Sequence, residues 1–154
     1  MDKKQFLMYY SNRNTIPTKV DIFSGGYIFG GTEGQTNTKA MTDTRIPYGV
    51  PVKITIEFRT IDMGDTTLAK ITAGTGFTAT NSSVTSPKTF TGTLTENSTT
   101  TLATFACYYN NYDSKNGNIT ITFNFTNKTI TVSGDNKGYA NMYLYLDKVT
   151  VEKI

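Results

Sequence analysis

Histidine and tryptophan are both absent from this chain of 154 residues, and cysteine occurs only once, at Cys107. Histidine is the side chain that most often serves as a general base and as a metal ligand. Its absence excludes serine–histidine and cysteine–histidine catalysis, and a single cysteine forms neither an intrachain disulfide nor a zinc site of paired cysteines. The 12 acidic residues are scattered, with no pair that suggests glycoside hydrolysis. We therefore expect a protein that is not an enzyme.

Charge is also scarce. Charged residues make up 18% of the chain, the formal net charge is +3, and lysine and arginine form no dense cluster. Nucleic-acid interfaces depend on such clusters, so we expect no nucleic-acid partner. No apolar run has the length of a signal peptide or of a membrane span. We expect synthesis in a reducing cytoplasm and no membrane partner.

What the chain does contain is a large share of β-forming residues. Threonine occurs 30 times, tyrosine 10 times and phenylalanine 9 times. Between Val50 and Arg59 apolar and polar side chains alternate, which is typical of a strand with one buried face. Similar runs follow between turn residues, whereas residues 32–44 and 74–86 resemble loops. The sequence predicts one all-β domain over residues 1–154, a two-sheet antiparallel β-sandwich of eight or nine strands, with 1–19 as an N-terminal arm.

A β-hairpin is predicted within residues 118–134. Its two apolar sets share one face if Asn127 and Lys128 form a two-residue turn. This turn would fix the pairing of Phe125 with Ile130 and of Phe123 with Val132.

The last predicted strand, NMYLYLDKVTVEKI, changes the face that it buries. Its apolar residues fall on even positions up to Leu146 and on odd positions from Val149 onward. Because side chains alternate between faces with a period of two, this change requires either one extra residue in the strand, a bulge, or a change of the face that is buried. We favour a bulge that bends the last strand at Asp147 and Lys148. The even positions before the bulge would face the core, so the tyrosines between them would lie on the outer face.

Two segments carry a resemblance to a known family. TITVSGDNKGYANMYLYLDKVTVEKI resembles the end of jelly-roll carbohydrate-binding modules of the galactose-binding-like type, and IPYGVPVKITIEFR is similar to an earlier strand of such modules. The resemblance implies a sandwich of jelly-roll type. It also implies that Asp147 is a candidate ligand for a structural calcium, while no other cofactor is expected. The alternative, a carboxylate that caps backbone donors at the bulge, is the one that we favour.

Five tyrosines are the candidate ligand or interface residues. Tyr143 and Tyr145 are predicted on the outer face of the last strand, and Tyr108, Tyr109 and Tyr112 lie beside a neighbouring loop. A tyrosine ring suits both the apolar face of a sugar and a protein interface. The carbohydrate-binding families rely on tryptophan, which this chain lacks, so we favour the protein interface.

The composition, rich in threonine, asparagine, glycine and tyrosine, resembles that of tailed-bacteriophage virion surface proteins. This resemblance implies a structural protein located in the virion, of the capsid-decoration or head-fibre type. Its expected partners are other virion proteins, such as the major capsid protein or fibre subunits, and further copies of itself in a homo-oligomer. The alternative is a carbohydrate-binding module or adhesin that recognises a bacterial surface glycan through its exposed tyrosines.

Overall fold

The computed structural model of the chain describes residues 2–3, 16–62, 66–109, 115–135 and 142–154. The fold is built from strands: β1 (Lys19–Phe23), β2 (Ile28–Gly31), β3 (Thr36–Ala40), β4 (Pro51–Asp62), β5 (Thr66–Ala73), β6 (Phe77–Ala79), β7 (Lys88–Thr93), β8 (Thr99–Tyr109), β9 (Lys115–Asn124), β10 (Thr129–Gly134) and β11 (Met142–Lys153). In the described part of the chain, no helix is long and apolar enough to cross a membrane.

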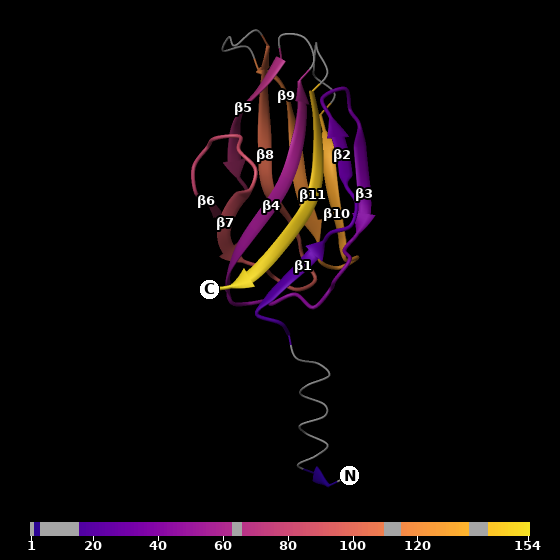
Figure 1. Ribbon diagram of the computed structural model, residues 1–154, viewed down its shortest axis with the longest axis vertical. Coiled ribbons are helices and arrows are strands. Elements are labelled where there is room, and N and C mark those ends of the chain that lie inside the picture. Colours follow the sequence, from indigo (N-terminus) through magenta and orange to yellow (C-terminus); the bar gives the residue numbers. More distant parts are fainter. Residues whose placement is uncertain (1, 4–15, 63–65, 110–114, 136–141) are drawn as a thin grey trace.

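The strands form two antiparallel sheets that pack face to face (Figure 1). Sheet 1 has the order β1-β11-β4-β7-β6, with β2 also paired to β11, and sheet 2 has the order β3-β10-β9-β8-β5. The chain passes repeatedly from one sheet to the other, and its last strand returns beside the first. The predicted all-β, two-sheet antiparallel sandwich is therefore confirmed, although it has more strands than the sequence predicted.

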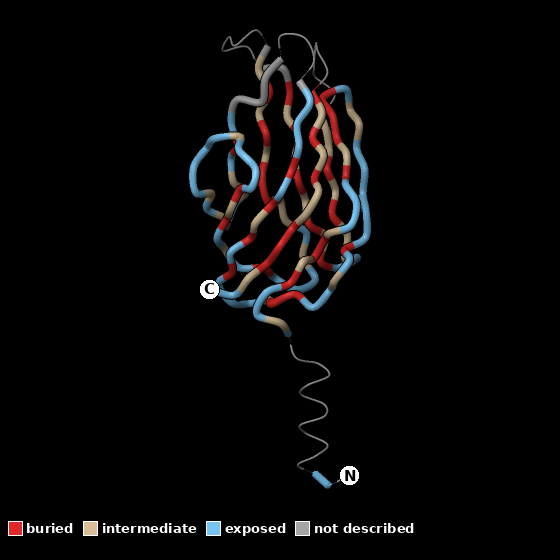
Figure 2. The backbone as a smooth tube through the Cα atoms, in the orientation of Figure 1, coloured by how far each residue is buried: buried red, intermediate tan, exposed pale blue. Residues whose placement is uncertain are grey.

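The buried residues form one hydrophobic core cluster between the sheets. Figure 2 marks the buried positions along the strands in red. Alternate residues of each long strand are buried there, as the period of two predicts. The rings of Phe58 on β4 and Phe105 on β8 meet edge to face across the core, with centroids 5.3 Å apart. The two sheets thus share one apolar layer.

Two segments that were predicted as loops contain short strands. β3 lies within residues 32–44, and all of its residues are exposed. Without a buried face it shows no apolar alternation, so the prediction of a loop was wrong here. The strand is ordered by pairing with β10, where the hydroxyls of Thr38 and Thr131 are 2.7 Å apart. β6 similarly interrupts the predicted loop 74–86.

The predicted arm 1–19 ends earlier than expected. Lys19 already belongs to β1, where it lies opposite Glu152, and the amide of Lys153 donates a 2.8 Å hydrogen bond to the carbonyl of Thr18. Most of the predicted arm, residues 1 and 4–15, lies outside the described residues.

The β9–β10 hairpin has a different register from the predicted one. Asn124, not Thr126, lies opposite Thr129, so the turn contains four residues. The Asn124 Oδ1 atom accepts hydrogen bonds from the amides of Thr126 and Asn127, and Lys128 has a φ of 57°. A turn that is longer by two residues leaves every side chain of the hairpin on the same face of the sheet. The apolar pattern therefore could not distinguish the two registers. The observed pairs are Phe123 with Ile130 and Ile121 with Val132.

The predicted bulge in the last strand is confirmed. Leu146 of β11 lies opposite Phe58 of β4, whereas Lys148 lies opposite Glu57, so Asp147 is the extra residue. The even-numbered apolar residues before the bulge and the odd-numbered ones after it all reach the core: Met142, Leu144, Leu146, Val149 and Val151.

Candidate binding surface

Four aromatic rings gather on the outer face of sheet 1, and we call them the aromatic patch: Tyr27, Phe29, Tyr143 and Tyr145. They come together because β2 pairs with β11 so that Phe29 lies opposite Tyr145. The Phe29 ring centroid is 5.2 Å from that of Tyr143 and 5.1 Å from that of Tyr145. The Tyr27 ring meets Tyr145 edge to face at 5.3 Å. These distances are typical of favourable aromatic pairs.

Gly31 makes room for one of these rings. It lies opposite Tyr143, and a Cβ atom added at Gly31 would be 2.7 Å from the Tyr143 Cδ1 atom. The tyrosine ring therefore lies against backbone that carries no side chain. The same added Cβ atom would be 2.6 Å from Gln35 Oε1, so a larger residue at Gly31 would force neighbouring side chains to shift.

An ion pair borders the patch on β4. The Arg59 guanidinium donates hydrogen bonds from Nε to Asp147 Oδ2 at 2.8 Å and from Nη2 to Asp147 Oδ1 at 2.9 Å. Its Cζ atom also lies 4.9 Å from the Tyr145 ring centroid. The hydrogen bonds to Asp147 raise the pKa of the Arg59 guanidinium above its ordinary value. The bulge thus presents a carboxylate that fixes an arginine beside the rings.

Further side chains extend the surface at its rim. Ile61, which lies opposite Tyr143, exposes 45% of its surface, and Tyr27 exposes 48%. On the other side the Lys39 ammonium lies 5.1 Å from the Tyr27 ring centroid. The surface therefore combines the rings of the aromatic patch with the aliphatic side chain of Ile61 and the cations of Arg59 and Lys39.

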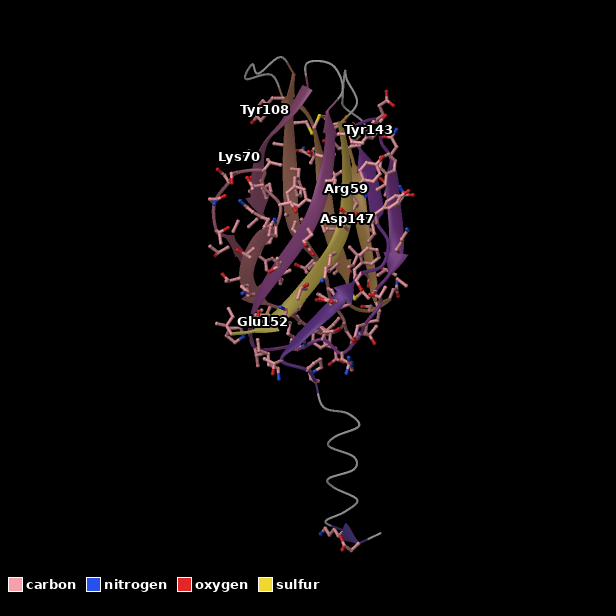
Figure 3. The ribbon with its side chains drawn as sticks, in the orientation of Figure 1. Arg59, Lys70, Tyr108, Tyr143, Asp147 and Glu152 are labelled. Atoms are coloured by element: carbon pink, nitrogen blue, oxygen red, sulfur yellow. The ribbon has the colours of Figure 1, made fainter. Side chains whose placement is uncertain are left out.

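The structure separates the five predicted tyrosines. Tyr143 and Tyr145 are half-buried on the outer face of sheet 1, which agrees with the face predicted for them. Tyr108 is half-buried on β8 of sheet 2, apart from them (Figure 3). The side chain of Tyr109 and the whole of Tyr112 lie outside the described residues.

Sequence reasoning missed Tyr27, Phe29 and Arg59 as members of this surface. The alternation of Tyr27 and Phe29 with the buried Ile28 was a usable signal, since it places the two rings on one face. It did not reveal that β2 pairs with β11. Only that pairing brings these rings beside Tyr143 and Tyr145.

The structure gives Asp147 a different partner from those expected. Its carboxylate is held by the Arg59 side chain, rather than by backbone donors of the bulge. The described residues contain no group of three or more His, Cys, Asp or Glu side chains that could hold a metal ion. The calcium site that the resemblance implied therefore gains no support from them.

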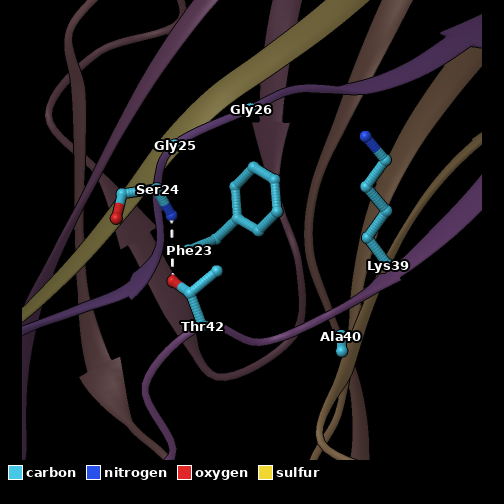
Figure 4. Close-up of a pocket in the computed structure, with 7 residues that line it drawn as sticks. All are labelled: Phe23, Ser24, Gly25, Gly26, Lys39, Ala40 and Thr42. Carbon is cyan, nitrogen blue, oxygen red and sulfur yellow. Dashed lines mark hydrogen bonds between the residues drawn. The ribbon is translucent and has the colours of Figure 1, made fainter.

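A hollow of about 360 Å³ opens near the patch, at the edge of the sandwich (Figure 4). One wall is the turn after β1, with Phe23 and Ser24 followed by a pair of glycines, and the other is the end of β3. The Ser24 amide donates a 3.1 Å hydrogen bond to the Thr42 hydroxyl and so links the two walls. The residues that line the hollow are Phe23, Ser24, Gly25, Gly26, Lys39, Ala40 and Thr42.

A buried lysine lies in sheet 1, and no pattern in the sequence predicted it. Lys88, the first residue of β7, is only 2% exposed. Its ammonium donates hydrogen bonds to the Asn81 side chain and, at 2.7 Å, to the Ser83 carbonyl. Burial lowers the pKa of the Lys88 ammonium below its ordinary value. These hydrogen bonds hold the loop before β7, which contains Asn81 and Ser83, against the core.

Comparison with protein-family models, with curated proteins and with solved structures finds no match to this chain.

Proposed function

We propose that this protein is a non-enzymatic structural protein of a tailed-bacteriophage virion, a β-sandwich that contacts other virion subunits through its aromatic patch. The observation that supports the contact is the gathering of four rings and Arg59 on one outer face. Tyrosine, phenylalanine and arginine are enriched in protein interfaces, and tyrosine and arginine often contribute most of the binding energy.

The geometry of the patch favours a preformed contact surface. Phe29 lies between two tyrosines, and Arg59 is held by two hydrogen bonds to Asp147. Side chains that are ordered before binding lose less conformational entropy when a partner arrives. The virion assignment itself rests on the compositional resemblance and is a separate part of the proposal.

The mass of the protein in solution tests the contact between copies. Light scattering should give a multiple of the 17.0 kDa chain mass for the wild type, and a lower mass for Tyr145→Ser and Phe29→Ser. Tyr108→Ser is the matched control, because it removes a half-buried tyrosine from the outer face of the other sheet. A monomeric wild type would contradict self-association through the patch. An equal decrease of mass in the Tyr108→Ser control would contradict it too.

The virion location needs its own test. Mass spectrometry of purified phage particles should detect peptides of this chain in a constant ratio to the major capsid protein. Peptides that occur in infected cells but not in the particles would rule out a structural role in the virion.

A second candidate function is glycan binding, and one observation favours it. The hollow at the edge of the sandwich lies beside Tyr27, the most exposed ring of the patch. Small-ligand sites combine apolar and aromatic surface with a few polar groups that orient the ligand, and the hollow with Tyr27 beside it offers both.

A further inference from the structure

The hollow lies where the edges of the two sheets separate. The edges are joined on one side by the Gly31 amide, which donates a 3.1 Å hydrogen bond to the Gln35 carbonyl. They are joined again where the Thr42 amide donates to the Ile22 carbonyl at 2.8 Å. Between these two links the Asn37 side chain of β3 also donates a hydrogen bond to the Phe29 carbonyl of β2. The hollow lies between the turn after β1 and the end of β3 (Figure 4).

Lys39 gives this opening an uncompensated positive charge. Among the described residues it forms no ion pair, in contrast to Lys53 and Lys148, which lie near carboxylates. Its ammonium is positioned over the Tyr27 ring instead. None of the residues that line the hollow is acidic. The opening is therefore suited to a ligand with negative charge.

The paired glycines leave one wall of the hollow without side chains. Gly25 has a φ of +81°, so its backbone conformation accounts for glycine there. Gly26 has no such φ, and a Cβ atom added to it would meet nothing within 4 Å. The packing of the protein does not require glycine at this position. Close approach of a ligand to the backbone would require it.

We propose that the hollow binds one residue of an acidic polysaccharide, a carboxylated sugar such as a hexuronic acid. Its carboxylate pairs with the Lys39 ammonium, and its ring lies over the bare backbone of Gly25 and Gly26, beside the exposed part of Tyr27. The hollow, at about 360 Å³, is within the range of small-ligand sites. This inference deepens the second candidate function, since it names the class of glycan and the residue that selects it.

A matched pair of ligands tests the role of the carboxylate. Tetragalacturonic acid and its fully methyl-esterified form share one backbone and differ in charge, and both are titrated into the full chain. We expect the acid form to shift the amide NMR signals of Gly25, Gly26 and Thr42. The ester should bind roughly tenfold more weakly or worse, because it lacks the charge-assisted hydrogen bond to Lys39.

Variants of the protein test the site. Lys39→Gln should weaken binding of the acid form by a similar factor and leave binding of the ester unchanged. Lys70→Gln is the control, because it removes an exposed lysine from β5, which is the edge of sheet 2 opposite to β3, and should change nothing. Gly26→Leu should block the hollow and weaken both ligands, while its melting temperature stays near that of the wild type because the added side chain points into open space.

The outcomes separate this inference from the function that it deepens. Equal binding of acid and ester would overturn the inference and retain glycan binding. If Lys39→Gln and Lys70→Gln lost equal affinity for the acid form, the ligand would be attracted by net charge alone, and the inference would also be overturned. No binding of either ligand would overturn the inference and remove the present support for glycan binding, without affecting the protein contact tested with Tyr145→Ser.

Discussion

Lys88 shows at the scale of a single residue how surroundings change the chemistry of a side chain. It occupies a position that faces the core, yet it reaches polar groups of the loop before β7. Its charged form loses contact with water there, and two hydrogen bonds only partly compensate. The cost of burying this charge depends on pH, which makes it measurable.

We predict that the free energy of unfolding rises as pH increases toward 10.5, the ordinary pKa of lysine. Burial lowers the pKa of Lys88 in the folded state, so between the two pKa values the unfolded chain binds more protons and higher pH favours folding. Below the folded pKa both states carry the proton, and this contribution is constant. Urea unfolding at several pH values should show a smaller rise in Lys88→Met than in the wild type. An identical pH dependence in the two proteins would contradict the assignment.

A second prediction at this scale concerns Gly134, where the two sheets nearly touch. A Cβ atom added there would lie 1.5 Å from the Gly31 carbonyl oxygen, which is backbone and cannot move aside easily. Gly134→Ala should therefore lower the free energy of unfolding by about 2 kcal/mol or more. Gly26→Ala is the control, since its Cβ atom meets nothing within 4 Å. Equal stability of the two variants in urea would show that the corner between the sheets is not tightly packed.

At the scale of the element, β11 contributes to the core along its whole length and also places Asp147 beside the aromatic patch. Its two halves bury residues of opposite parity, and the bulge at Asp147 makes this possible without a break in the strand. The same bulge aims the Asp147 carboxylate at Arg59 beside the aromatic patch. The number of residues in this strand therefore matters more than the identity of the residue at the bulge.

Deletion and substitution of Asp147 should have different effects. Deletion removes the extra residue, so one half of β11 must turn its apolar side chains away from the core. We expect the deletion variant to lose cooperative unfolding in circular dichroism. Asp147→Ala keeps the residue count and loses only a solvent-exposed ion pair, so its melting temperature should change little. A deletion variant that melts like the wild type would show that the bulge is dispensable.

The hairpin between β9 and β10 marks the limit of pattern reasoning for an element. The apolar positions of both strands identify which face is buried, and the structure agrees with that face. They do not distinguish a two-residue turn from a four-residue one, because both preserve parity. The side chain of Asn124, which accepts two amide hydrogen bonds, stabilises the longer turn.

At the scale of the whole molecule, the two sheets share one core and should unfold together. Phe90 of sheet 1 and Phe105 of sheet 2 are both fully buried in it. Replacing either with alanine leaves a cavity in the same apolar layer, so each variant should lose about 3 to 5 kcal/mol of stability. We expect one transition by calorimetry and by tyrosine fluorescence in both variants. Two transitions, or destabilisation of one sheet alone, would contradict a single cooperative unit.

The outer face of sheet 2 explains at this scale why the chain contains so much threonine. Neighbouring strands align their threonines into rows, one of which runs Thr38, Thr131, Thr122 and Thr101. β-Branched residues suit a pleated surface, and their hydroxyls keep it polar without charge. The aromatic patch lies on the opposite sheet, so the two outer faces of the sandwich differ in character.

The sequence by itself determined the fold class, the buried face of the long strands and the bulge at Asp147. These features depend on the alternation of side chains along one strand, which is a local property. The predicted outer position of Tyr143 and Tyr145 followed from the same rule and is confirmed. Local rules did not reveal β3, because an exposed edge strand has no buried face to alternate with.

Only the tertiary structure decided which strands became neighbours, and with them the candidate sites. Tyr27 and Tyr145 are far apart in the sequence and meet because β2 pairs with β11. Arg59 lies within hydrogen-bonding distance of Asp147 because β4 pairs with β11, on the side of β11 opposite to β2. Strand pairing over such separations depends on closing long loops around a shared core, and no short-range pattern encodes which partner is chosen.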